Sequence, residues 1–123
     1  MNWRYILMSK TMNIDEFTEF ADHVLDKEIP QVLLRELNLG VCVFPEAKEE
    51  QGYYIMGEYV VNEMGKHIAL YFGSFQAILD GESLTTWKEE IRDTIKHELQ
   101  HHIEALAGEE TLAKFEEEEG FDE

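Results

Sequence analysis

The chain has 123 residues, of which 44% are apolar, including seven Phe, five Tyr and two Trp. This length and composition fit one domain with a single modest core and argue against global disorder. The formal net charge of −17 repels phosphate backbones, so we expect no nucleic-acid partner, whereas cationic partners and metal ions are favoured.

The sequence contains no sign of a membrane segment or of secretion. No run of about eighteen apolar residues is present. The apolar start at residues 3–8 is too short for a signal-peptide core and lacks a small-residue cleavage site. The single cysteine, Cys42, has no intrachain partner, which agrees with a reducing compartment. We therefore expect a cytoplasmic protein that makes no membrane contact.

The first predicted element is an amphipathic helix over residues 13–27. Asn13 and Glu16 form a capping box at its start. Apolar residues then recur at helical spacing, namely Phe17, Phe20, Ala21, Val24 and Leu25. Residues 1–12 precede this pattern and are assigned to an N-terminal extension.

A second helix and several short strands are expected next. The helix begins at Pro30, which suits a first turn, and ends near Gly40. The strands are bounded by glycines and a charged loop over 45–52. They cover 41–44, 53–56, 58–61 and 67–72, the last being the strongest strand pattern, and residues 75–79 form one helical turn.

The last predicted element is the longest helix. Thr86 and Glu89 form a second capping box, so the helix is expected from Trp87 to about Ala107, with Gly108 just past its end. The acidic residues 109–123 then form a solvated helix end or a tail. Helices, three or four short strands and a long helix predict one α+β domain with a small mixed sheet over residues 13–108.

The long helix carries the motif His97-Glu98-Leu99-Gln100-His101. Residues four apart on a helix differ by about 40° of rotation and roughly 6 Å of rise, so both imidazoles project from one face and can share one ion. Two histidine nitrogens suit Zn²⁺ and leave positions for a third ligand and a water. Glu98 can reach that water as a general base.

The apolar stripe of the same helix lies elsewhere. The residues that form it are Ile91, Ile95, Leu99 and Leu106. They cluster roughly opposite His97 and His101, so these two histidines are not expected in the core. His102 lies nearer the stripe and is expected to be packed and hydrogen-bonded rather than a ligand. His23 and His67 are expected to be structural or surface residues.

The segment from Thr94 to His102 resembles the HExxHH segment of the minimal zincin-like metallopeptidases, which are small bacterial proteins. The upstream order of an acidic helix, a strand and the metal helix is similar as well. The resemblance implies a compact zincin-like α+β core, a zinc ion and peptidase activity. It also implies that the strand ending at Gly73 aligns an extended peptide, which makes His67, Ala69, Tyr71 and Gly73 substrate-binding residues.

The sequence departs from the family at the third metal ligand. Many members read HExxHxxGxxD, whereas this chain has Glu104 and Ala107 in the positions of that Gly and Asp. Three replacements are open. Glu104 lies on the same helix face as the histidines, Glu109 and Glu110 follow Gly108, and a carboxylate among residues 116–119 would return on an antiparallel segment.

Three functions therefore remain open at the level of sequence. The first is a zinc-dependent metallopeptidase (a hydrolase) that acts on a peptide or protein, with Glu98 as general base. The second is a non-catalytic metal-binding or protein-interaction module, suggested by the missing third ligand. The third is an acidic decoy that imitates nucleic acid, which rests on the net charge alone.

Overall fold

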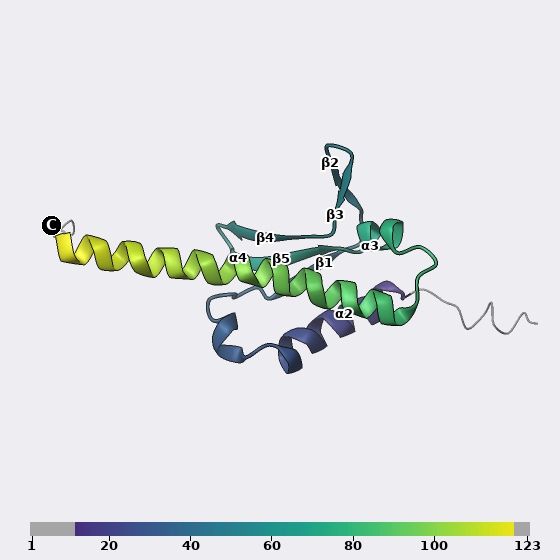
Figure 1. Ribbon diagram of the computed structural model, residues 1–123, viewed down its shortest axis with the longest axis horizontal. Helices are drawn as coiled ribbons and strands as arrows, with labels where there is room; N and C mark the ends of the chain where they lie inside the picture. Colours follow the sequence, from purple (N-terminus) through teal and green to yellow (C-terminus); the bar gives the residue numbers. More distant parts are fainter. Residues whose placement is uncertain (1–11, 120–123) are drawn as a thin grey trace, which may run out of the picture.

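The computed structural model describes residues 12–119, with the side chains of residues 12–112 and of Lys114. It confirms an α+β fold in which the helices α2 (Ile14–His23) and α4 (Leu84–Glu119) lie on one side of a small sheet (Figure 1). The expected N-terminal extension lies outside the described residues except for Met12, whose side chain is buried. None of the described helices is long and apolar enough to cross a membrane.

Helix α2 begins as predicted. The Asn13 side chain accepts the Glu16 N–H at 2.8 Å, and the Glu16 carboxylate accepts the Asn13 N–H at 3.0 Å, so the capping box is confirmed. After His23 the chain continues as one wide turn of π-helix, η1 (Val24–Glu28).

The predicted second helix over 30–40 is wrong. Only a short 3-10 helix, η2 (Gln31–Leu34), forms after Pro30. Arg35 is not helical, with ψ at 140°, and Glu36 adopts a left-handed conformation with φ at 64°. These two residues end the helix because each leaves the right-handed helical region. Leu37 still reaches the core, so its burial does not require a helix.

The main sheet has three strands in the order β1-β5-β4. Strand β5 is central, parallel to β1 and antiparallel to β4. A separate hairpin, β2–β3, projects from this sheet (Figure 1) and includes a strand within the predicted charged loop 45–52. The five strands are β1 (Val41–Phe44), β2 (Lys48–Glu50), β3 (Tyr53–Ile55), β4 (Gly57–Asn62) and β5 (Gly65–Tyr71).

Helix α4 begins earlier and ends later than predicted. Ser83 takes the capping position, where its hydroxyl accepts the Thr86 N–H at 3.2 Å, so the helix starts three residues before Trp87. Gly108 does not end it, because the helix continues to Glu119 through the expected boundary at 108. The shorter helix α3 (Phe72–Ile78) follows β5 directly and contains the predicted turn at 75–79 except for its last residue, Leu79, which caps the helix.

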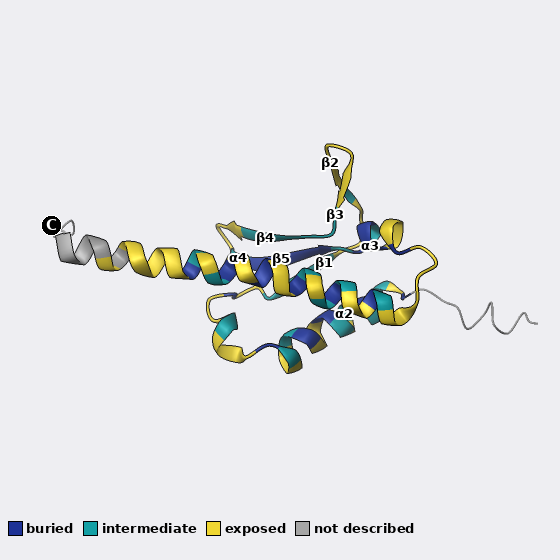
Figure 2. Cartoon of the chain, viewed as in Figure 1, coloured by how far each residue is buried: buried dark blue, intermediate teal, exposed yellow. Residues whose placement is uncertain are grey.

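The core lies between the sheet and the two long helices (Figure 2). Phe17 of α2 meets the rings of Phe72, Phe75 and Trp87 edge-on, at centroid distances of 5.2, 4.8 and 6.4 Å. The predicted apolar stripe of α4 is confirmed as buried, at Ile91, Ile95, Leu99 and Leu106. The opposite side of α4 is therefore left facing solvent and the sheet edge.

Candidate functional site

His97 and His101 lie together on the exposed side of α4, as the sequence predicts. Their ring centroids are 5.0 Å apart and the rings are nearly perpendicular, at 86°. The His101 side chain is 52% exposed. The pair is therefore open to a ligand, and neither ring is used in core packing.

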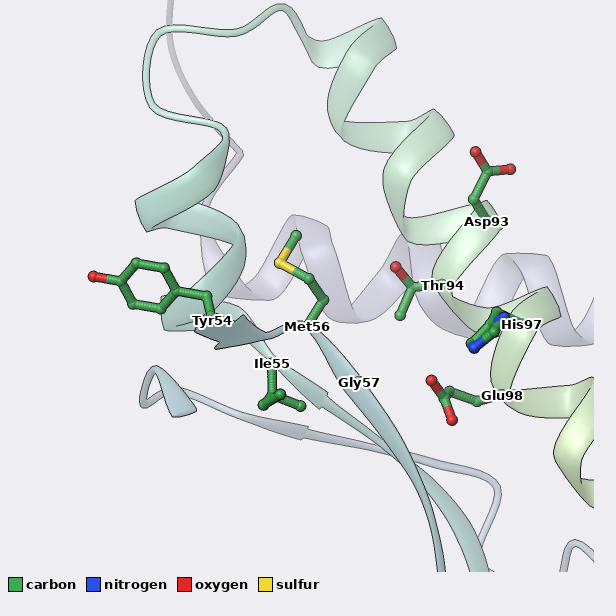
Figure 3. A pocket seen from close by; sticks show the side chains of 8 residues that line it. All are labelled: Tyr54, Ile55, Met56, Gly57, Asp93, Thr94, His97 and Glu98. Atoms are coloured by element: carbon green, nitrogen blue, oxygen red, sulfur yellow. The ribbon is translucent and has the colours of Figure 1, made fainter. Parts of the chain in front are cut away.

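Glu98 lies between this pair and the sheet. Its residue is only 9% exposed, and Figure 3 shows its carboxylate directed from α4 toward the strand that carries Gly57. Burial raises the pKa of Glu98 above its usual value, while His97, His101 and the backbone N–H of Tyr59 act in the opposite direction. A buried carboxylate with a raised pKa beside two open imidazoles is a candidate for proton transfer.

Two cavities meet at Glu98. One, of about 310 Å³, is lined from α4 by Thr94 and His97 and from the strand side by residues 54–57. The other, of about 450 Å³, is lined by His101 and by carboxylates of β2 and β4. Both are lined by Ile55, Gly57 and Glu98, so the carboxylate stands where they join.

The walls of this cleft carry negative charge. Glu50 and Glu58 line the larger cavity beside Glu98. Glu58 accepts hydrogen bonds from the Lys48 ammonium and, at 2.7 Å, from the Tyr71 hydroxyl; the Lys48 bond in particular lowers the pKa of Glu58. Lys48 is thus engaged with one carboxylate, and the cleft keeps an excess of negative charge.

The outer edge of β4 borders the same cleft. The Ile68 N–H donates to Gly40 O at 2.9 Å, so Ile68 of β5 makes its backbone bonds toward β1. Its partner across the antiparallel pair, Tyr59, therefore turns its N–H and C=O away from β5, and Gly57 and Val61 do the same by alternation. This places backbone groups of an edge strand next to Glu98.

The structure gives β5 no edge for the substrate-aligning role that the sequence predicts for it. Strand β5 is hydrogen-bonded to β1 on one side and to β4 on the other, so it has no free edge to receive a peptide. His67 and Ala69 are buried, the Tyr71 hydroxyl binds Glu58, and Gly73 belongs to α3. The edge strand on this side of the sheet is β4. Finding it from sequence would require knowing that β1 pairs in parallel with β5.

The proposed third ligands do not assemble around the two histidines. The Glu104 Oε1 is 3.7 Å from the His101 Nδ1. Glu109 pairs with Lys66, at 3.0 Å, and Glu110 pairs with Arg35, so both are drawn to the loop before β1 and the start of β5. Over residues 12–112 and Lys114, no three potential metal ligands come together, and the side chains of residues 116–119 lie outside the described part.

The remaining histidines behave as the sequence predicts. His102 is fully buried and is hydrogen-bonded at both ring nitrogens. His23 is exposed on α2 and stacks on Phe20. Tyr59, which meets both Glu98 and His102, was not predicted as a site residue. The alternating pattern of β4 predicts that Tyr59 lies on a strand, but it does not predict which residues of α4 Tyr59 contacts.

Comparisons with known proteins correct the family. No family model and no curated protein matches the chain. Among solved structures, a conserved hypothetical protein from Thermus thermophilus is 40% identical, with a TM-score of 0.65 over 83% of this chain and 87% of that one. Since its description names no peptidase and the described residues hold no three-ligand group, the assignment to the minimal zincin-like metallopeptidases does not stand.

Proposed function

The chain belongs to the family of this conserved hypothetical protein, and from its own residues we propose that it hydrolyses peptide bonds with zinc held by His97 and His101. The observation that carries the proposal is the position of Glu98. Its buried carboxylate stands between two cavities, one residue from the first exposed imidazole. Burying a carboxylate costs free energy, so its place beside two exposed imidazoles supports a functional role.

The two imidazoles suit zinc on chemical grounds. They project from adjacent turns of one rigid helix, and the Glu104 carboxylate, 3.7 Å from His101, stands beyond hydrogen-bond distance. Zinc lowers the pKa of a bound water toward neutrality. Because the described residues supply two ligands, the remaining positions are left to water, to substrate or to a residue outside the described part.

Glu98 is suited to move the proton. Its raised pKa makes the carboxylate a better base than an exposed glutamate, and its burial keeps the group out of bulk water. In the proposed reaction Glu98 takes the proton of the attacking water and returns it to the leaving amine. Tyr59, whose backbone N–H lowers the pKa of Glu98, lines the same cavity on the strand side.

The edge of β4 is suited to bind the peptide. Outward N–H and C=O groups at Gly57 and Val61 can pair with an extended segment, as in other cases of strand addition. The carboxylates of the cleft favour a segment with basic side chains. We therefore propose flexible, basic peptides as the preferred substrates.

The first test measures metal and turnover in the same samples. Wild-type protein should bind about one equivalent of zinc and cleave a quenched peptide library, and Glu98→Gln should keep the zinc and lose at least about a hundredfold in rate. Glu89→Gln, on the exposed first part of α4, removes the same charge as a control. Turnover in Glu98→Gln at the wild-type rate would sink the assigned mechanism.

The second test locates the metal. Zinc added in excess should raise the thermal midpoint of the wild-type protein through binding to the folded state. His97→Ala and His101→Ala should abolish this rise, whereas His23→Ala, at an exposed histidine of α2, should keep it. A rise that persists in both site variants would place the metal elsewhere.

A non-catalytic docking function is the second candidate, because the described residues bring only two metal ligands together. With two protein ligands, the site can serve as a weak metal-dependent docking point without catalysis. Peptide binding measured with and without zinc, beside the turnover assay, separates the two functions, because a docking module binds peptide in a zinc-dependent manner and gives no cleavage at any peptide composition.

A further inference from the structure

A second stripe of α4, beside the two histidines, is in contact with the edge strand. Thr94, Glu98 and His102 are spaced four apart and so lie on one face of the helix. Each meets β4 at a different level. Thr94 approaches Gly57, Glu98 lines a cavity together with Tyr59, whose backbone N–H lowers the pKa of the carboxyl, and His102 meets the hydroxyl of the same tyrosine.

Tyr59 thus touches two successive positions of this stripe. Its backbone reaches Glu98, while its hydroxyl lies 2.7 Å from the His102 Nδ1, with the two rings 5.2 Å apart. On the other side of the imidazole, Nε2 is 2.8 Å from the carbonyl oxygen of Arg35. Because a carbonyl can only accept, Nε2 carries the proton and Nδ1 accepts from the tyrosine.

The imidazole is an unusual anchor for a surface strand. His102 has no exposed surface, and both of its ring nitrogens are used. A satisfied polar group at such a position holds its partners in one geometry, because every alternative leaves a buried group unpaired. This anchor acts on the side of β4 that faces α4, whereas the sheet holds the strand through its pairing with β5.

We propose that Tyr59 and His102 are positioning residues that fix the edge of β4 against α4 at the level of Glu98. The pair acts on the Glu98 carboxylate through the Tyr59 backbone and touches neither the metal pair nor the substrate. This inference rests on the proposed hydrolysis for its kinetic consequence, but the fixed position of the strand exists without it.

The test uses Tyr59→Phe, which removes one oxygen atom and keeps the ring in the core. Thr18→Val is the matched control, because Thr18 also donates a part-buried hydroxyl bond, of 2.8 Å, on α2 away from the cleft. Amide exchange of residue 59 is measured by NMR on both proteins. We expect about fivefold to tenfold faster exchange in Tyr59→Phe, as one lost hydrogen bond implies, and no change in Thr18→Val.

Kinetics give the second measurement. In Tyr59→Phe, kcat should fall about tenfold while KM and zinc affinity stay within about twofold, because the base is displaced and the metal pair is not. The amide of residue 59 should exchange more slowly in His102→Asn, which keeps a hydrogen-bond acceptor near the tyrosine, than in His102→Leu. A purely structural role would lower the thermal midpoint of Tyr59→Phe and leave kcat unchanged well below that midpoint.

The outcomes separate this inference from the proposed function. If the amide of residue 59 exchanges faster in Tyr59→Phe and the wild-type protein cleaves no peptide, the fixed position of the strand is supported and the proposed hydrolysis is contradicted. Unchanged exchange at residue 59 overturns the positioning pair, whatever the wild-type rate. Faster exchange with unchanged kcat in an active protein also overturns it as a positioning pair for the reaction.

Discussion

Gly57 and Thr94 lie so close that a Cβ atom on the glycine would stand 2.7 Å from the Thr94 Cγ2. The same atom would meet the Ala69 carbonyl oxygen and the Leu70 Cδ2 at 3.1 Å. The edge strand therefore approaches the helix as closely as a missing side chain allows, and this closeness brings the Tyr59 N–H within reach of Glu98.

Gly57→Ala should push β4 away from α4. Overpacking of this kind costs about 1–3 kcal/mol, so the free energy of unfolding in urea should fall by that amount and hydrolysis should fall with it. Adding Thr94→Ser removes the methyl group in closest approach and should recover part of both losses. A double variant no better than Gly57→Ala would show that the methyl contact is not the cause.

Gly108→Ala should stabilise the protein. Gly108 lies within α4 with no atom near its missing Cβ, so alanine improves helix propensity by about 0.5–1 kcal/mol. If Gly108 lay just past the helix end, as the sequence predicts, Gly108→Ala would destabilise the protein, because alanine disfavours a left-handed conformation. Thermal unfolding decides between the two, with Gly52→Ala, at φ +83°, as a destabilising reference.

Glu28→Gln should reveal a pH-dependent contribution to stability. The Arg92 guanidinium donates to both carboxylate oxygens, and this lowers the pKa of Glu28 below its ordinary value of 4.5. A carboxyl whose folded pKa is depressed stabilises the fold above its unfolded pKa and loses that contribution as pH falls through the folded pKa.

Wild type should therefore be more stable than Glu28→Gln at pH 7, and the difference should shrink below about pH 4. Denaturant titrations at a series of pH values measure it. Asp26→Asn serves as the control, since Asp26 is 68% exposed beside Lys27 and should give almost no difference at either pH. A constant gap for Glu28→Gln across the series would contradict the ion-pair origin.

Glu50→Gln should weaken the preference for basic peptides. Glu50 lines the larger cavity from β2, whereas Glu49 beside it does not line either cavity. An exposed charge contact is worth about 0.2–1 kcal/mol, so KM for lysine-containing peptides should rise by a factor of about 1.4 to 5 in Glu50→Gln. Glu49→Gln makes the same change in net charge, and an equal rise of KM in that variant would show that the effect comes from the overall field of the protein.

The sequence predicts that His97 and His101 share one face, that Glu98 adjoins them and that His102 is packed, because each of these placements depends on helical spacing alone. One helix fixes the relative positions of residues that are three to five apart, whatever it packs against. The capping box of Asn13 was predictable for the same reason, since both partners lie within one turn.

The sequence did not predict the contacts that depend on distant pairing. The parallel pairing of Val41 with Ile68 makes β5 central and leaves β4 at the edge, and no local pattern specifies this pairing. The prediction of a second helix over 30–40 is wrong because residues 35 and 36 leave the helical region, although the leucines of this segment are spaced as in a helix. The prediction that the long helix ends before Gly108 is wrong because a glycine next to open space can remain in a helix.

The β2–β3 hairpin is joined to the fold chiefly at its base. The Lys48 N–H donates to the Ser74 hydroxyl oxygen at 2.9 Å, and a side chain on Gly73 would strike the backbone of Ala47. The tip turns through Gln51 and Gly52, away from the three-stranded sheet (Figure 1). Residues can therefore be inserted at this tip during evolution, or by an engineer, to reshape one wall of the cleft while strand register and helix α4 stay unchanged.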